Sequence, residues 1–182
     1  TTFGRRILIQ NINVIISFMR ILGIDPGIGR TGWAVVESEK GKLKALSYGC
    51  LETEPNSEIT KRLLKISLYI ESLIKSHKPD VLAIEELFFI TNSKTAFIVG
   101  QARGVILLGA AKNNVPVAIY TPLQVKMAVT GYGRADKNQI GQMVKVILKL
   151  EKIPKMDDTS DALAVALAHA FTAKFKSKTN VK

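Results

Sequence analysis

Acidic side chains occur at three places in the chain where burial would make their charge unfavourable. Asp25 closes a short apolar run, and Glu85, followed by Glu86, closes another. The third place is the start of a helical pattern and contains Asp157, Asp158 and Asp161. An isolated buried carboxylate is destabilising by several kcal/mol unless it is paired with a cation or binds a metal ion. The phrases GIDPG and AIE contain no lysine or arginine, which favours a metal ion as the partner.

The kinds of residue available narrow the choice of metal. The chain contains one cysteine, Cys50, and two histidines, His77 and His169, which excludes an internal disulfide and a thiolate-only metal site. Oxygen ligands without histidine or thiolate suit Mg²⁺ or Mn²⁺ rather than Zn²⁺. Two such ions about 3.5–4 Å apart activate water and stabilise the leaving oxygen of a phosphodiester. The acidic residues therefore indicate phosphodiester chemistry.

Each acidic position also has a purely structural interpretation. Asp25 begins the turn sequence Asp-Pro-Gly, and Asp157 or Asp158 would serve as the N-cap of a helix. Asp161, in the first turn of that helix, would complement its dipole. Glu85 is harder to explain in this way because the strand around it is apolar. The three positions together favour the metal site, while each alone leaves the structural interpretation open.

Composition and charge indicate one basic globular domain. The 182 residues are enough for a single domain with a sizeable core, and 47% hydrophobic with 23% charged residues argues against extended disorder. The 26 Lys and Arg residues exceed the 15 Asp and Glu residues, which gives a net charge of +11. Such an excess suits nucleic acid first and an anionic membrane surface second, although a basic protein without a polyanionic partner has the same composition.

The hydrophobic pattern predicts the elements that must position these acids. Three strands, at 20–25, 31–37 and 42–51, are expected to follow one another as antiparallel hairpins. The elements expected after them are helices at 57–77, 93–113, 136–150 and 158–174 and strands at 81–86 and 115–120. Hairpins followed by alternating strands and helices predict an α/β fold, a mixed sheet with helices packed on its faces.

We expect a single domain over residues 19–174. Residues 1–18 precede a strongly patterned sequence that begins at Met19, so we interpret them as an N-terminal extension outside the fold. An Arg pair followed by an apolar run gives this segment a faint likeness to an organelle presequence, which is the alternative interpretation. Residues 175–182 form a basic tail.

Five phrases, in order, resemble the RuvC family of Holliday-junction resolvases: GIDPGIGRTGWAVV, PDVLAIEELFF, GQARGVILLGA, QVKMAVTGYGRADKNQI and DDTSDALAVALAHA. The resemblance covers Met19 to about His169, nearly all of the chain beyond the extension. It implies a ribonuclease H-like fold with helices on both faces of the sheet. It also implies an endonuclease that cuts two symmetric strands of a DNA four-way junction in recombination and repair.

The same resemblance implies a cofactor and partners. The cofactor is Mg²⁺, with Mn²⁺ as a substitute and two ions in each active site. The partners are four-way junction DNA, a second copy of the chain in a homodimer, and the RuvA–RuvB branch-migration complex. No association with a membrane is expected. The implied location is the cytoplasm, or an organelle if residues 1–18 are a presequence.

The family's metal-binding and catalytic residues fall on four acids of this chain: Asp25, Glu85, Asp158 and Asp161. In the family the penultimate acid lies three residues before the aspartate of DALA, which selects Asp158, although Glu86 and Asp157 leave the ligand set open by one residue each. Lys126 and Lys137 match lysines that the family uses near the scissile phosphates, and Phe88 matches an aromatic that stacks on bases at the opened junction. The alternative interpretations are solvated lysines and core packing of Phe88.

Residues 93–113 resemble the dimer helix of the family, with Gly100 and Gly104 four residues apart, although an ordinary core helix would show the same glycines. Two other functions remain open. One is a different ribonuclease H-like nuclease that acts on RNA–DNA hybrids or transposon ends. The other is a non-catalytic DNA-binding module that has kept the fold.

Overall fold

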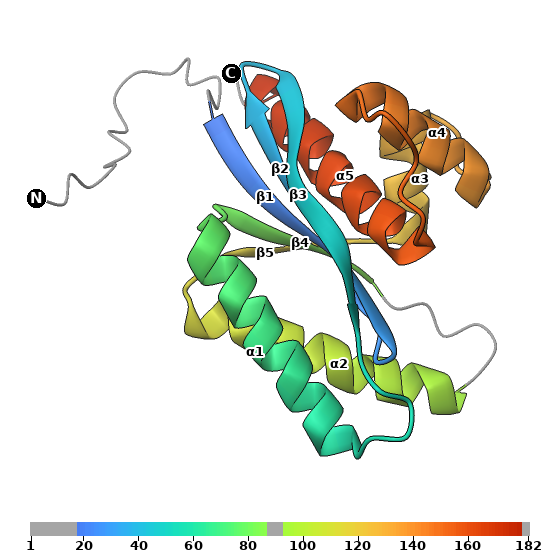
Figure 1. The fold of residues 1–182 in the computed structure, drawn as a ribbon. Coiled ribbons are helices and arrows are strands. Elements are labelled where there is room, and N and C mark those ends of the chain that lie inside the picture. The colour runs from blue at the N-terminus through green and yellow to red at the C-terminus, as the bar shows by residue number, and fades with distance from the viewer. Residues whose placement is uncertain (1–17, 87–92, 180–182) are drawn as a thin grey trace, which may run out of the picture.

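The computed structural model describes residues 18–86 and 93–179, with side chains at 18–86 and 96–173 (Figure 1). Its strands are β1 (Phe18–Asp25), β2 (Arg30–Glu39), β3 (Lys42–Glu52), β4 (Val81–Glu85) and β5 (Val117–Tyr120). They form one sheet with the order β3-β2-β1-β4-β5. β1, β2 and β3 pair antiparallel, whereas β4 pairs in parallel with β1, and β5 in parallel with β4. The prediction of a mixed sheet is confirmed.

The described helices are α1 (Ile59–His77), α2 (Ser93–Lys112), α3 (Pro122–Thr130), α4 (Lys137–Leu148) and α5 (Asp157–Thr179). α1 and α2 cover one face of the sheet, and α5, with α3 and α4 beside it, covers the other, as predicted (Figure 1). Two apolar cores result, one around Ile66 and Ile106 beneath α1 and α2, and one around Leu163 beneath α5. In the described part of the chain, none of the helices combines the length and apolar character needed to cross a bilayer.

The alternation of side chains along the strands decides on which face each acid lies. Along β1, Ile24 belongs to the core beneath α1 and α2, and Ile21 belongs to the core beneath α5. Because side chains alternate along a strand, Asp25 lies on the face that α5 covers. Along β4, Ala83 belongs to the core beneath α5. Glu85 therefore lies on the same face as Asp25.

α5 packs close to the sheet because glycines leave room for its backbone. A Cβ atom on Gly23 would overlap the carbonyl oxygen of Ala162, and one on Gly32 would overlap the carbonyl oxygen of Asp158. Gly32 pairs with Asp25 across the β1–β2 ladder. The first turn of α5 therefore lies directly against the strand end that carries Asp25.

The sequence-based prediction lacked α3, which lies between β5 and α4 at residues 122–130. The missed helix has strong local signals. Thr121 and Gln124 form a reciprocal capping box, Pro122 occupies the first helical position, and Gly131 ends the helix in the left-handed conformation. With only nine residues, α3 is too short for a convincing apolar period, and its stability comes largely from packing on α5 and α4.

The ends of the other helices differ slightly from the prediction. α4 has the predicted N-cap, Asp136, in a capping box with Gln139. It ends at Leu148, before its predicted end, because Lys149 adopts a left-handed conformation as the C-cap. α5 runs to Thr179, beyond its predicted end.

Candidate active site

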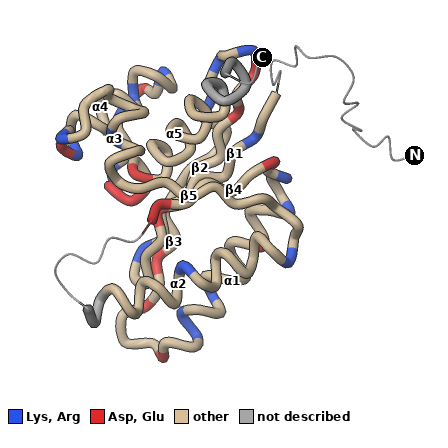
Figure 2. The backbone as a smooth tube through the Cα atoms, turned by 180° about the vertical axis from the view of Figure 1, so that it is seen from behind, with Lys and Arg blue, Asp and Glu red and all other residues tan. Residues whose placement is uncertain are grey.

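The carboxyl ends of two parallel strands bring two predicted acids side by side. In the parallel pairing of β1 with β4, Ile24 lies opposite Ile84, so Asp25 and Glu85 follow as neighbours at the same edge of the sheet. Figure 2 shows the acidic end of β4, where the grey trace begins, in the middle of the molecule between the two helix layers. Two carboxylates that are distant in the sequence thus share one strand-end site.

α5 contributes a third predicted acid to this site. Asp161 lines a cavity of about 340 Å³ together with Asp25 and Glu85. Two predicted lysines line the same cavity, Lys126 from α3 and Lys137 at the start of α4. The other lining residues are Pro122, Val125, Ile140 and Ala164. The structure therefore gathers five of the predicted residues around one cavity.

The fourth predicted acid, Asp158, is not among the residues that line this cavity. Its Oδ2 atom lies 3.0 Å from Nε of Arg30, the first residue of β2. The negative charge of Asp158 still contributes to raising the pKa of Asp25, so the carboxylate lies close to the site. We expected no role for Arg30 from the sequence, although it stands in the same phrase as Asp25.

Lys137 is engaged with acids of α5. Its Nζ atom donates a hydrogen bond of 3.3 Å to Oδ2 of Asp161 and lies 3.8 Å from Oδ2 of Asp157. Desolvation acts to lower the pKa of Lys137, but the charge and hydrogen bond of Asp161, with smaller contributions from Asp157 and Asp25, raise it overall. Lys137 is therefore a firmly protonated cation at the edge of the cavity.

Burial and mutual repulsion oppose the ionisation of the acids in the cavity. Desolvation, together with the negative charges of Asp161 and Glu85, raises the pKa of Asp25 from 3.8 to about 7. Desolvation and the charge of Asp161 raise the pKa of Glu85 from 4.5 to about 7. The positive charge of Lys137 opposes both shifts. The cavity thus concentrates negative charge that its own lysines offset only in part.

The chemistry of these donors fits a divalent metal ion. Asp25, Glu85 and Asp161 present oxygen atoms to one cavity, and a divalent cation would relieve their repulsion. Among the residues that the structure describes, no three Asp, Glu, His or Cys side chains stand close enough together to ligate an ion. The two predicted ligands on α5, Asp158 and Asp161, are instead held by Arg30 and Lys137. The acidic side chains must therefore rotate toward one another to ligate a metal ion, whereas the backbone positions that carry them are already close together.

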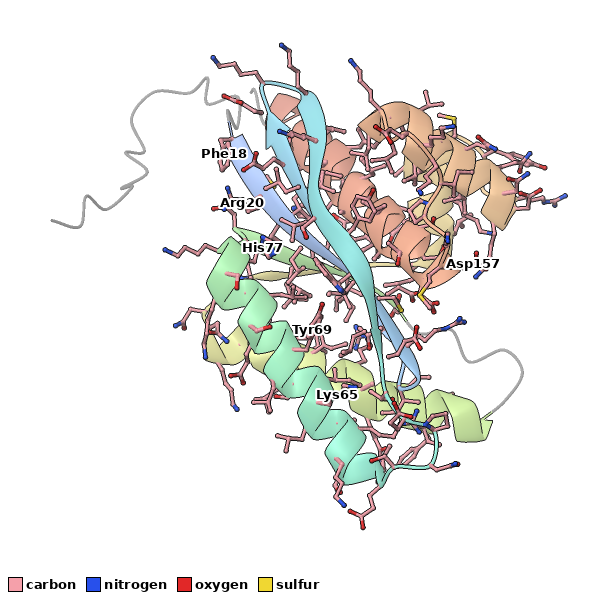
Figure 3. All side chains as sticks on the ribbon, viewed as in Figure 1. Phe18, Arg20, Lys65, Tyr69, His77 and Asp157 are labelled. Atoms are coloured by element: carbon pink, nitrogen blue, oxygen red, sulfur yellow. The ribbon has the colours of Figure 1, made fainter. Side chains whose placement is uncertain are left out.

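The remaining predicted residues lie at the margin of the site or beyond the described residues. Phe88 lies outside the described residues. Glu86 is exposed, and the side chain of Asp157 is 71% exposed. Asp157 lies at the start of α5, where Figure 3 labels it. Neither Glu86 nor Asp157 lines the cavity.

The raised pKa values predict how the stability of the metal-free protein depends on pH. The folded state keeps protons on Asp25 and Glu85 up to about pH 7, whereas the unfolded chain loses them near pH 4. The unfolded state therefore binds fewer protons across this interval, and the free energy of unfolding falls as pH rises from about 4 to 7. Each pKa unit corresponds to about 1.4 kcal/mol, so we expect these two acids to contribute a loss of a few kcal/mol.

Thermal melts in EDTA across this pH range measure the effect. The variant Asp25→Asn with Glu85→Gln removes both titrations, so its melting temperature should fall less with rising pH than that of the native chain. Equal pH slopes for the two proteins would show that the native acids titrate normally. Excess Mg²⁺ at pH 8 should restore stability to the native chain and have little effect on the double variant.

The topology and the site together define a class. The fold is a mixed sheet of five strands with helices on both faces. Acids lie at two neighbouring strand ends and at the start of the helix that covers them. This arrangement defines a ribonuclease H-like nuclease. The family model described as "Crossover junction endodeoxyribonuclease RuvC" matches residues 21–169. The chain belongs to this RuvC family. Membership in this family of nucleases implies dependence on a divalent metal.

Individual relatives agree with this assignment. The chain is 53% identical to the crossover junction endodeoxyribonuclease RuvC of Caldicellulosiruptor saccharolyticus over 85% of its own length and 94% of that protein. It is 50% identical to the RuvC of Alkaliphilus metalliredigens over 90% of its length and all of that protein. Among solved structures, Thermus thermophilus RuvC in complex with a Holliday junction substrate matches with a TM-score of 0.83 and 37% identity, over 87% of this chain and 97% of that one.

Proposed function

We propose that the chain resolves Holliday junctions as a metal-dependent endonuclease that makes paired, symmetric nicks. The observation that carries the proposal is the cavity in which Asp25, Glu85 and Asp161 meet two lysines. Acids of this kind, beside lysines able to hold a phosphate, suit hydrolysis of a phosphodiester. Family membership and the similarity to a RuvC bound to a Holliday junction support this substrate over other nucleic acids.

The proposed metal ligands are Asp25, Glu85, Asp158 and Asp161. Mg²⁺, with Mn²⁺ as a substitute, would be held as two ions that supply an activated water and stabilise the leaving oxygen. Asp25 and Glu85 would provide ligands on neighbouring strand ends, and Asp161 would close the site from α5, whereas Asp158 lies outside the lining of the cavity. The exposure of Glu86 and Asp157 favours Glu85 and Asp158 over these sequence neighbours as ligands.

Residues around the acids would bind and orient the DNA. Lys126 and Lys137 project from two different helices into the cavity margin, which suits contact with the phosphate being cut. Lys137 is held near the acids by Asp161, so its charge is already positioned before DNA arrives. For Phe88 the proposal remains stacking on unpaired bases at the junction centre, a contact typically worth about 1–3 kcal/mol per base.

Paired nicks require two sites, and we propose that a homodimer provides them. The large apolar side chains of Phe97 and Leu108 on α2 are 71% and 53% exposed. Apart from the backbone of α2 itself and the adjacent residues, no atom of the described residues lies within 4 Å of a Cβ atom built at Gly100 or Gly104, so these glycines leave open space along α2. Both features support a dimer contact through this helix.

We also propose the wider context of the reaction. The chain would act in the bacterial cytoplasm with the RuvA–RuvB branch-migration complex, in keeping with bacterial relatives. An organelle remains the alternative if residues 1–18 are a presequence. Residues 19–174 would form the nuclease domain, with residues 1–18 as an extension and residues 175–182 as a basic tail.

A panel of DNA and RNA substrates tests the proposed function. The purified 182-residue chain is incubated with a mobile four-way junction, linear duplex DNA and an RNA–DNA hybrid, with Mg²⁺ or with EDTA. We expect paired nicks at symmetric positions of the junction only when Mg²⁺ is present. Preferred cutting of the hybrid would indicate a different ribonuclease H-like nuclease. Tight junction binding without any metal-dependent nicking would indicate a non-catalytic DNA-binding module.

Replacement of Lys126 by alanine tests its proposed phosphate contact. Loss of one contact should reduce the slope of the logarithm of junction affinity against the logarithm of salt concentration by about 1. Cleavage should fall by about tenfold or more because the phosphate loses a positioning charge. Lys42→Ala is a matched control, since Lys42 is exposed at the β2–β3 hairpin, at the opposite end of the sheet from Asp25. Equal salt slopes for the two variants would exclude the contact.

A further inference from the structure

The ion pair between Arg30 and Asp158 joins the first residue of β2 to the first turn of α5. Arg30 begins β2 and is 56% exposed at its side chain, whereas the side chain of Asp158 is 20% exposed. The close packing that Gly32 permits brings the backbone of Asp158 against β2, beside Arg30. The Arg30 guanidinium therefore reaches into the margin of the site from a solvent-exposed position.

The contact between these two side chains is electrostatic rather than a well-aligned hydrogen bond. Nε of Arg30 lies 3.0 Å from Oδ2 of Asp158, yet this buried oxygen has no hydrogen-bond partner of acceptable geometry among the described residues. A buried carboxylate oxygen without an aligned donor keeps its capacity to accept another ligand. The charge of the Asp158 carboxylate is thus balanced by Arg30, but its Oδ2 atom can still accept a further ligand.

The other predicted ligand on α5, Asp161, is also held by a cation, although here the contact is a hydrogen bond. Asp161 pairs with Lys137 at 3.3 Å. Among the described residues, Asp25 and Glu85 have no ion pair, and burial raises the pKa of each. Within the described part of the chain, cations therefore pair with Asp158 and Asp161, whereas neither Asp25 nor Glu85 has a cation within ion-pair distance.

We infer that Arg30 is a built-in counter-ion that holds Asp158 in the metal-free protein and competes with the divalent ion for this carboxylate. The inference rests on the proposed function, in which Asp158 is a metal ligand. Before metal binding, the positive charge of Arg30 stabilises the acidic site. The same charge repels the divalent ion that approaches Asp158. Arg30 is a positioning residue, because it acts through Asp158.

Binding of Mn²⁺ to the whole 182-residue chain without DNA tests this inference. The free Mn²⁺ signal in electron paramagnetic resonance gives the affinity directly. Arg30→Gln should tighten Mn²⁺ binding by about two- to fivefold, in line with the strength of a partly exposed ion pair. Arg30→Lys keeps the charge and should stay near the native affinity. Lys65→Gln removes a charge from an exposed residue of α1, labelled in Figure 3, and should leave the affinity unchanged.

A double-mutant cycle separates competition at Asp158 from a general change in charge. In an Asp158→Asn background, Arg30→Gln should no longer change Mn²⁺ affinity. Unchanged or weaker binding in Arg30→Gln alone would overturn the inference, as would an equal gain in the Asp158→Asn background. Circular dichroism melts of each variant confirm that it is folded.

The same protein preparations separate this inference from the proposed function. If the native chain binds Mn²⁺ and cuts four-way junctions but Arg30→Gln binds Mn²⁺ no more tightly, only the role of Arg30 fails. If the native chain neither binds Mn²⁺ nor cuts junctions, the proposed function and the role of Arg30 both fail.

Discussion

Replacement of Asp25 by asparagine is expected to abolish junction cleavage while leaving junction binding intact. Asp25 stands at the centre of the acidic cluster, since Glu85, Asp158 and Asp161 all contribute to raising its pKa. Its carboxylate would be a shared metal ligand, and metal ions supply several kcal/mol of transition-state stabilisation. The rate of cleavage in Mg²⁺ should therefore fall by about 10³-fold or more.

Two further measurements make this first prediction specific. Asp157→Asn is the matched control, because Asp157 is an exposed aspartate beside the site that does not line the cavity, and this variant should keep most of its activity. Gel-shift titrations in Ca²⁺ should give Asp25→Asn the native affinity for the junction or a slightly higher one, since a negative charge near the DNA is removed. Cleavage by Asp25→Asn at a rate near that of the control would contradict the proposed site.

Replacement of Gly32 by alanine is expected to damage both stability and catalysis. The new Cβ atom would overlap the carbonyl oxygen of Asp158, which belongs to the backbone of α5 and cannot rotate away. Either β2 or the start of α5 must shift, and overpacking of this kind typically lowers the free energy of unfolding by about 1–3 kcal/mol. A displacement of about 1 Å between Asp25 and the acids of α5 should reduce cleavage by about 10²-fold.

Gly29→Ala is the matched control for this second prediction. A Cβ atom at Gly29 would meet only Nη2 of Arg62, at an ordinary contact distance of 3.8 Å. Chemical denaturation should therefore give Gly29→Ala a free energy of unfolding near that of the native protein, and single-turnover assays should give it a near-native cleavage rate. Gly32→Ala should be clearly lower in both. Native stability and native activity in Gly32→Ala would show that the close approach of α5 to β2 does not position the acids.

The elements that carry the acids could be predicted because their patterns are local. The apolar run before Asp25, the apolar strand before Glu85 and the capping box at Asp136 depend on neighbours within a few residues. α3 shows where prediction from local sequence patterns fails. Its capping box at Thr121 was present in the sequence, but its nine residues gave no long apolar period, and packing on α5 stabilises it.

The sequence by itself determined the kinds of residue at the site, the class of fold and the resemblance to one family, since these follow from residue types and short-range periodicity. Only the tertiary structure decided which face each acid occupies, that Asp158 pairs with Arg30, and that Lys137 holds Asp161 beside the cavity. These contacts join residues that are far apart in the chain. Their distances depend on how closely α5 approaches the sheet, which is a property of packing between layers rather than of any local pattern.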